Sequence, residues 1–345
     1  MTVATMLSEI ETIGADRSRG GHSRPGYSRV DRELREWFVA HAQRRGLDVQ
    51  RDRNGIVWAW WRPAGATGPA IVTGSHLDSV PGGGAYDGPL GVASALVAFD
   101  ELRAEESALE RPVAIGVFPE EEGSRFGVAC LGSRLLSGAI ARDRALALRD
   151  GEGDSFADVA RRDGLDPELV GRDDAQLSQI GAFVELHVEQ GRGLVDLDRP
   201  VAIASSILGH GRWRVVVQGQ GNHAGTTLMG DRRDPLVAAA AMILAIRDLA
   251  RATPDARATV GRIEPTPGGT NVIASAVSFW IDLRHPDDLV TAELVARTRD
   301  LVASLAAAEG CRATMHEESL SPTVDFDGGL RARLRSALPT APELG

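Results

Sequence analysis

The sequence has 345 residues, and its 38 basic residues, all of them arginine, against 48 acidic residues give a formal charge of −10. A chain of this length is expected to form about two domains, and an apolar share of 43% is enough for a sizeable core. The acidic balance argues against nucleic acid as a partner. The longest apolar stretch, residues 236–246, is too short to span a bilayer, so no membrane partner is expected.

The cysteines and the first residues bear on the compartment. Cys130 and Cys311 lie far apart and predict neither a disulfide framework nor a cysteine metal site. Residues 1–21 contain acidic residues and no long apolar run, so they do not resemble a signal peptide. These features predict a cytoplasmic protein.

The first half of the chain alternates predicted strands and helices. Apolar periodicity and turn residues predict helices over residues 31–46 and 89–105 and strands over residues 56–61, 69–76, 111–118 and 181–188. Asp87 lies near the start of the second helix, and Pro89 is in its first turn. A strand, a helix and a strand in this order predict a parallel crossover. Residues 141–180 are polar and favour helix.

The second half of the chain predicts a different order of elements. Strands are predicted over residues 211–220, 258–265, 271–285 and 311–319, and helices over residues 234–251 and 286–310. This β-α-β-β-α-β order is that of a ferredoxin-like domain. We therefore expect residues 208–321 to form an inserted two-layer domain, which interrupts a first domain formed by residues 1–207 and 322–345.

Polar side chains gather where the predicted strands of the first domain end. His76 and Asp78 are two residues apart, so both point to the same side of a strand, and Asp78 could orient a histidine ligand. Asp87 follows in a glycine-rich loop. Taken singly, a helix N-cap for Asp87 and a core position for His76 are the simpler interpretations. Their shared position at strand ends favours a site.

Glu120, Glu121 and Glu122 follow the strand predicted over residues 111–118, and His187 lies in the strand predicted over residues 181–188. Three adjacent carboxylates commonly form a solvated charge run. The alternative is that one glutamate is a metal ligand and another is a general base, because a divalent cation offsets the repulsion between carboxylates. Mixed nitrogen and oxygen ligands suit Zn²⁺ or Mn²⁺.

A second polar group lies in the inserted domain. His223 and Asn271 occupy glycine-flanked loops, and Arg284 ends a strand. Arginine grips a carboxylate in a bidentate manner, and Asn and His can hold an amide or an oxyanion. Turn residues and a surface charge are the alternative interpretations. Together the three residues predict a substrate clamp.

Five segments carry a family resemblance: residues 74–88, 120–127, 185–191, 222–235 and 270–285. They resemble the di-metal amidohydrolases of the aminoacylase and carboxypeptidase superfamily, and within it the allantoate amidohydrolase, N-carbamoyl-L-amino-acid hydrolase and ureidopropionase branch. The resemblance implies an α/β fold, with a mixed-sheet di-metal hydrolase catalytic domain and an inserted ferredoxin-like lid and dimerisation domain. Residues 120–136 and 185–197 are most similar to bacterial allantoate amidohydrolases.

The resemblance also implies a role for each site residue. One divalent metal ion, zinc or manganese, would be bound by His76, Asp87 and His187, and a second by Asp87 and Glu122. Glu121 would be the general base, with the register of the three glutamates open by one position, and Asp78 would act beside it. Substrate contacts would come from Gln190, His223, Asn271 and Arg284. The family dimerises through the inserted domain, so that His223 and Asn271 would serve the site of the neighbouring subunit.

The implied function is metal-dependent hydrolysis of a linear amide or ureido C–N bond in a small carboxylate substrate, most of all allantoate. N-carbamoyl-L-amino acids and 3-ureidopropionate present the same groups and remain alternatives. A peptidase of the same superfamily is a further alternative, although a peptide needs no ureido clamp. A dimeric binding protein without activity is the alternative from another class.

The sequence departs from the family pattern at three places. Leu228 stands where the family usually has proline, and Ser275 where it often has glycine. The family continues beyond the segment "TAPELG" with a Gly-His-Asp motif, whose histidine completes the second metal site. The resemblance therefore implies a chain shortened at its C-terminus, with an incomplete second metal position.

Overall fold

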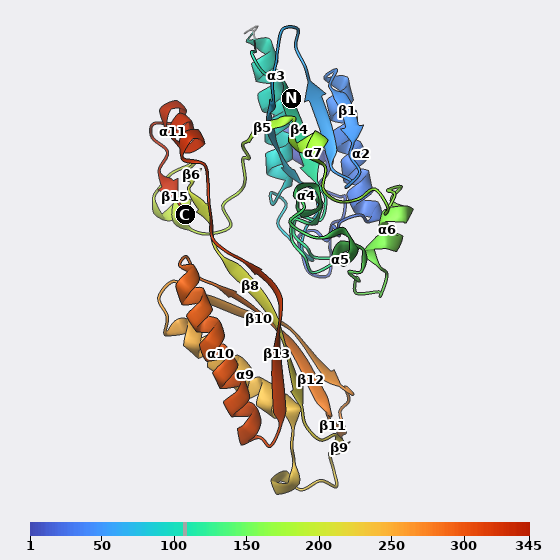
Figure 1. Cartoon of the computed structure of the whole chain (residues 1–345), viewed down its shortest axis with the longest axis vertical. Helices are drawn as coiled ribbons and strands as arrows, with labels where there is room; N and C mark the ends of the chain where they lie inside the picture. The colour runs from blue at the N-terminus through green and yellow to red at the C-terminus, as the bar shows by residue number, and fades with distance from the viewer. Residues whose placement is uncertain (106–108) are drawn as a thin grey trace. The chain divides into compact units, whose positions relative to one another are not determined.

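The computed structural model of the protein describes residues 1–105 and 109–345, and the chain divides into two compact units, Met1–Gln190 and Gly191–Gly345 (Figure 1). Both units combine helices with a sheet, so the predicted α/β class is confirmed. The predicted inserted domain, residues 208–321, lies within the second unit, and its limits stay a prediction.

The first unit contains a mixed five-stranded sheet with the order β1-β2-β4-β3-β5. Its strands are β1 (Asp48–Arg51), β2 (Val57–Trp61), β3 (Ala70–His76), β4 (Val113–Phe118) and β5 (Ile180–Phe183). β3 runs parallel to β4 and to β5, whereas β2 is antiparallel to β4 and to β1. The carboxyl ends of β3, β4 and β5 therefore meet at one edge of the sheet, which is where parallel sheets place their sites.

Helices pack on both faces of this sheet. The helices of the first unit are α1 (Val3–Glu9), α2 (Arg29–Arg44), α3 (Pro89–Ala104), α4 (Leu131–Ser137), α5 (Arg142–Leu146), α6 (Phe156–Arg162) and α7 (Asp174–Leu177). Of these, α5 and α6 pack with α4 in a cluster beside the sheet. Alternate residues of β2 point to opposite faces, as the pleat requires. Ala59 lies in one buried cluster with Phe38 of α2, and Trp58 lies in another with Leu136 of α4. The strands that position the candidate site are thus held from both sides.

A buried ion-pair cluster joins α2 to β1 and to the end of α6. The carboxylate of Asp163 accepts two hydrogen bonds from Arg35, both of 3.0 Å, and also pairs with Arg32 at 3.3 Å and with Arg51. Arg35 lies 3.1 Å from Asp31 as well, and the side chains of Asp163 and Asp31 are almost fully buried. Each buried charge has an opposite charge beside it, which offsets the cost of removing it from water.

The second unit contains a four-stranded antiparallel sheet with the order β10-β12-β8-β13. Its main elements are β8 (His210–Gln218), α9 (Pro235–Arg251), β10 (Arg257–Thr266), β12 (Ala276–Arg284), α10 (Asp288–Ala308) and β13 (Arg312–Ser321). This is the predicted β-α-β-β-α-β order. Phe279 and Leu283 of β12 are buried with Met242 of α9, so Asp282 and Arg284 lie on the opposite face of the sheet.

Short elements complete the second unit. They are α8 (Gly193–Asp196), β6 (Ile203–Ala204), β7 (Ser206–Ile207), β9 (Asn222–His223), a 3₁₀ turn (Met229–Asp231), β11 (Val272–Ile273), β14 (Val324–Asp325), α11 (Gly328–Ala337) and β15 (Glu343–Leu344). β14 pairs with β7, and β15 pairs with β6. The segment after β13 therefore returns to the segment that precedes β8.

Two predicted strands differ from the structure in their bounds, and one predicted helix differs in the residue that caps it. The single strand predicted over residues 271–285 is divided into β11 and β12, because β11 pairs with β9 whereas β12 pairs with β8 and β10. The strand predicted over residues 181–188 ends at Phe183, so His187 lies in a segment beyond it. α3 starts from Gly88, which makes no side-chain cap, so Asp87 does not cap this helix. Among the described residues, no helix has the length and apolar character needed to cross a membrane.

The close pairing of β3 with β4 yields a prediction for Gly74. This residue has φ of +138° and lies opposite Gly116, and a Cβ atom at Gly74 would lie 1.9 Å from the carbonyl oxygen of Gly116. We expect Gly74→Ala to lower the free energy of unfolding by about 2–3 kcal/mol, since strand spacing or backbone conformation must change. Gly151→Ala is the matched control, because Gly151 has open space around it. Equal urea midpoints for the two variants would contradict the prediction.

Candidate active site

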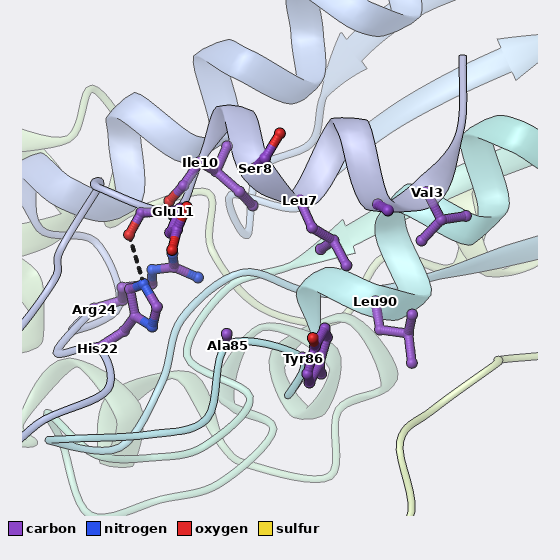
Figure 2. Close-up of a pocket in the computed structure, with 11 residues that line it drawn as sticks. Val3, Leu7, Ser8, Ile10, Glu11, His22, Arg24, Ala85, Tyr86 and Leu90 are labelled. Carbon is purple, nitrogen blue, oxygen red and sulfur yellow. Dashed lines mark hydrogen bonds between the residues drawn. The ribbon is translucent and has the colours of Figure 1, made fainter.

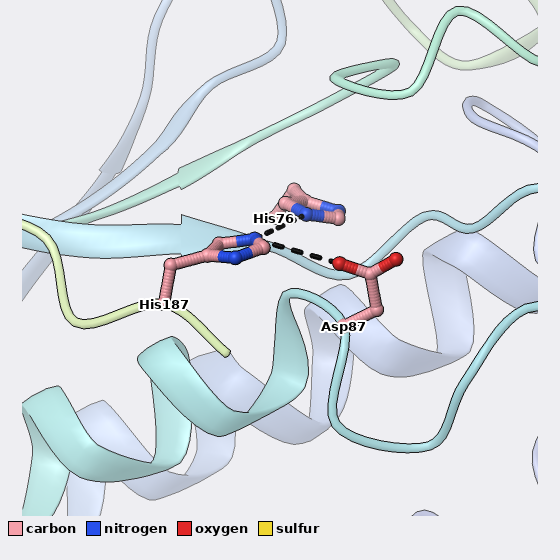
Figure 3. Close-up of side chains that lie close together, drawn as sticks. All are labelled: His76, Asp87 and His187. Atoms are coloured by element: carbon pink, nitrogen blue, oxygen red, sulfur yellow. Dashed lines mark hydrogen bonds and ion pairs between the residues drawn. The ribbon is translucent and has the colours of Figure 1, made fainter. Parts of the chain in front are cut away.

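Three side chains from separate segments converge at the carboxyl edge of the first sheet. His76 is the last residue of β3, Asp87 precedes α3, and His187 follows β5. The two Nε2 atoms lie 3.4 Å apart, and Nε2 of His187 lies 3.5 Å from Oδ1 of Asp87 (Figure 3). One ligand atom from each residue can be chosen so that all three lie within 4.8 Å of one another. Two imidazole nitrogens and a carboxylate around one point suit a divalent metal ion.

The other ring nitrogen of each histidine fixes which nitrogen carries the proton. Nδ1 of His76 lies 2.9 Å from the carbonyl oxygen of Asp78, and Nδ1 of His187 lies 3.0 Å from that of Val188. A carbonyl oxygen only accepts, so Nδ1 donates in both rings, and each neutral ring presents a lone pair on Nε2. Two lone pairs that face each other at 3.4 Å are stabilised by a cation between them. The residues present therefore fit a metal ion.

The three adjacent glutamates point to different places. Glu120 is fully buried, and its Oε1 accepts hydrogen bonds from the amides of Arg125 and Phe126 at 2.9 and 2.8 Å. Oε2 of Glu121 lies 3.7 Å from Nε2 of His76. Glu122 shares a hydrogen bond with Asp87. Only Glu121 and Glu122 thus face the three converging side chains, and the run is not a solvated charge run.

The environment of Glu122 is strongly negative. Burial, the nearby charges of Asp87 and Glu121 and the hydrogen bond with Asp87 raise the pKa of Glu122 to about 8. Carboxylates that raise one another's pKa are stabilised in the ionised form by a divalent cation. Asp87 and Glu122 could therefore hold a second ion beside the first.

Asp78 is fully buried and holds the backbone of Glu121 and Glu122 in place. Its two carboxylate oxygens accept the amide protons of Glu121 and Glu122, each at 3.1 Å. Burial, with the nearby charge of Glu120, raises the pKa of Asp78. Asp78 ties the glutamate loop after β4 to the end of β3. Gln190 also reaches the site, because its amide nitrogen donates to Oδ2 of Asp87.

Glu185 and Cys130 also lie at the site, although the sequence did not single out either of them as a site residue. The hydroxyl of Ser75 donates to Glu185. The carboxyl group of Glu185 lies near His187 and His76, and burial raises its pKa. Glu185 could have been identified from the sequence, because it lies two residues before His187. The thiol of Cys130 lies 3.3 Å from Oε1 of Glu121. No sequence spacing indicates this contact.

The residues of the predicted clamp lie in the second unit, where two of them come together. β9, which contains His223, pairs with β11, and the amide of Ala224 donates to the carbonyl of Asn271 at 3.1 Å. Nδ1 of His223 accepts the amide proton of Gly225 at 3.0 Å. Its Nε2 therefore carries the proton and can donate to an oxyanion.

Arg284 is the last residue of β12, whereas Asn271 lies before β11, ahead of the first residue of β12. β12 separates them, and its nine residues span about 26 Å at roughly 3.3 Å per residue. Arg284 donates two hydrogen bonds to Asp282, of 2.7 and 3.1 Å, and this pairing raises the pKa of Arg284. Within one chain, the structure therefore does not bring Arg284 to the other two clamp residues.

A cavity of about 510 Å³ lies between α1 and the start of α3 (Figure 2). Tyr86 and Leu90, which line it, flank Asp87, but none of the predicted site residues lies in its wall. Arg24 is buried there and donates to the carbonyls of Ile10 and Ile13 at 2.9 Å each. These bonds hold the end of α1, so we assign this cavity to the packing of α1 and not to the site.

Comparisons with known proteins identify the family of this chain. Residues 72–340 match the model for peptidase family M20/M25/M40. The chain is 35% identical over 296 residues to an N-carbamoyl-L-amino acid amidohydrolase of Geobacillus stearothermophilus, covering 86% of this chain and 70% of that protein. It is 35% identical over 303 residues to an allantoate amidohydrolase of Bacillus subtilis (strain 168), covering 87% and 72%.

A solved structure gives the same result. The crystal structure of an amidase of the hydantoinase/carbamoylase family from Burkholderia vietnamiensis matches with a TM-score of 0.90 at 30% identity, over 99% of this chain and 82% of that one. The family resemblance predicted from the motifs is thereby confirmed. The family match, the two relatives and the shared fold lead to one conclusion: the chain belongs to peptidase family M20/M25/M40.

Proposed function

We propose that the protein is a metal-dependent amidohydrolase that cleaves a linear ureido or amide C–N bond, with allantoate as the favoured substrate. The observation that carries the proposal is the convergence of His76, Asp87 and His187 with their Nε2 lone pairs facing one another. The family is metal-dependent, and relatives 35% identical to the chain are amidohydrolases. The cytoplasm remains the proposed compartment.

His76, Asp87 and His187 would hold the first ion, zinc or manganese, and Asp87 with Glu122 would hold a second. When bound, such an ion supplies Lewis acidity that activates water and polarises the amide carbonyl. Among the described residues, the second position has two protein ligands against three for the first, so we expect it to bind its ion more weakly.

Glu121 is the proposed general base. The carboxylate of Glu121 is partly exposed and lies beside His76, so a water molecule next to the proposed metal ligands can reach this carboxylate. It would accept a proton from the attacking water and pass the proton to the leaving nitrogen. Asp78 would keep Glu121 in place through the amide hydrogen bond.

The proposed substrate contacts are assigned from the hydrogen-bond donors that the candidate side chains offer. Arg284 would bind the substrate carboxylate, Nε2–H of His223 would donate to the developing oxyanion, and Asn271 and Gln190 would hold the ureido amide. Because β12, which spans about 26 Å, separates His223 and Asn271 from Arg284, one small substrate cannot touch all three in a single chain. We propose that the protein is a homodimer through residues 208–321, in which these two residues complete the site of the neighbouring subunit.

N-carbamoyl-L-amino acids are the second candidate substrates, because a relative of equal identity is named for them. Allantoate, N-carbamoyl-L-amino acids and 3-ureidopropionate, assayed in parallel on zinc- and manganese-loaded protein, distinguish the candidates. Turnover of dipeptides alone would reject the ureido assignment. Metal binding without turnover of any substrate would favour a binding protein.

The first prediction concerns the metal. His187→Ala removes one of three ligands, so we expect the tightly held ion to be lost, with affinity reduced at least about 100-fold. Equilibrium dialysis against Mn²⁺, with metal analysis of the protein, measures this. His316→Ala, an exposed histidine of β13, is the control. Unchanged metal content in the His187→Ala protein would contradict the site.

The second prediction concerns the base. Glu121→Gln keeps the size of the side chain and removes its basicity, so we expect kcat to fall by roughly 10²–10⁴-fold. Metal content should stay that of the unmodified protein, because Glu121 is not among the proposed ligands. Near-normal kcat, or loss of the metal together with activity, would show that Glu121 has another role.

The third prediction concerns specificity. Arg284→Ala should raise KM for carboxylate substrates roughly 10- to 100-fold, since a charge-assisted contact is lost. Arg262→Ala is the matched control, because Arg262 also pairs with an acidic residue two positions away, Glu264, on the same sheet. If the two variants raise KM equally, or if Arg284→Ala impairs a substrate amide equally, Arg284 does not bind the carboxylate.

A further inference from the structure

Cys130 is joined to Glu121 through two contacts. Its amide donates to the carbonyl of Glu121 at 2.6 Å, and its Sγ lies 3.3 Å from Oε1 of the same residue. Cys130 precedes α4, nine residues beyond Glu121, and its side chain is partly buried. One residue therefore holds both the backbone and the carboxylate of the proposed base.

The two oxygens of Glu121 face different partners. Oε1 meets the thiol, whereas Oε2 lies 3.7 Å from Nε2 of His76. A carboxylate only accepts, so the thiol donates. Burial, followed by the charge of Glu121, raises the pKa of Cys130 to about 12, so the sulfur keeps the proton that this hydrogen bond needs.

The backbone fixes the thiol in this place. Cys130 has φ of +58°, a conformation that side chains rarely adopt and that costs about 1–2 kcal/mol. The amides of Leu131 and Gly132 donate to the carbonyls of Glu120 and Pro119, at 3.1 and 3.3 Å. Together with the Cys130 amide, they bind the start of α4 to the glutamate loop, and this maintains the strained residue.

We propose that Cys130 is a positioning residue for the general base: its thiol holds Oε1 of Glu121, so that Oε2 stays directed at the metal ligands and takes the proton of the attacking water. This inference rests on the proposed function of Glu121. No proton leaves the sulfur. The hydrogen bond restricts the rotation of the partly exposed Glu121 side chain before the substrate binds. Without this bond, the rotational freedom of Glu121 would have to be lost in every catalytic cycle.

The kinetic test uses manganese-loaded protein and three variants. Cys130→Ala should lower kcat about 3- to 10-fold, the range of one hydrogen bond, with KM and metal content unchanged. Cys130→Ser restores a donor and should keep kcat within about twofold of the unmodified protein. Cys311→Ala, the other free cysteine, is buried in the second unit and is the control. Equal loss in the alanine and serine variants at Cys130, or no loss in either, would overturn the proposal.

A double-mutant cycle shows whether Cys130 acts through Glu121. In the Glu121→Gln background, Cys130→Ala should cost less than about twofold in kcat, since there is no base left to position. Multiplicative losses in the double variant would show that Cys130 supports the site by another route and would overturn the proposal.

A measurement that needs no activity separates this inference from the proposed function. In the Cys311→Ser background, iodoacetamide modifies Cys130 alone. Glu121→Gln removes the charge beside the thiol, so alkylation at pH 8 should become at least about threefold faster. Ureido hydrolysis is measured on the parent protein that retains Glu121. If the parent hydrolyses ureido substrates and Glu121→Gln leaves the alkylation rate unchanged, the contact alone is overturned. If Glu121→Gln speeds alkylation but the parent hydrolyses no ureido substrate, the contact is retained and the proposed function is rejected, and with it the positioning of a base.

Discussion

The close parallel pairing of β3 with β4 is the constraint on which the candidate site depends. Gly74 and Gly116 face each other without side chains, and this lets the two strands run side by side to their ends. His76 ends β3 two residues later, and the glutamate loop begins two residues after β4. A wider spacing would move the histidine nitrogens and the carboxylate oxygens apart, so a backbone contact in the core sets the distances in the candidate site.

The candidate site contains several carboxylates close together, and neutral hydrogen-bond donors around it partly offset their negative charge. Backbone amides of Glu121 and Glu122 satisfy both oxygens of buried Asp78. The Gln190 amide donates to Asp87, and the thiol of Cys130 donates to Glu121. None of these four donors carries a net charge, so none of them neutralises Asp87 or Glu122, and the divalent ion proposed above would do so. An arginine in their place would have occupied the same carboxylate oxygens.

Much of the site could be predicted from the sequence, because the carboxyl ends of parallel strands meet at one edge whatever the details of packing. His76, Asp87 and His187 followed from that rule together with the motifs. The sequence could not distinguish among three identical glutamates, since the positive φ of Glu120, +53°, turns its side chain into the core. Cys130 could not be found at all, because its contact depends on where α4 begins. In the second unit, the order of elements was predictable, whereas the break between β11 and β12 depends on which strand each of them pairs with.

The absence of lysine gives the buried cluster around Asp163 an unusual response to alkali. An ammonium group loses its proton at a pH of about 10.4, whereas a guanidinium keeps its own beyond about 12. Arg35 therefore stays cationic, because the carboxylates of Asp31 and Asp163 outweigh the effect of burial and raise the pKa of Arg35 further. Alkaline unfolding of the first unit should accordingly begin with hydroxyl or thiol groups that are forced to ionise in the core, such as the buried phenol of Tyr27, and not with the breaking of ion pairs.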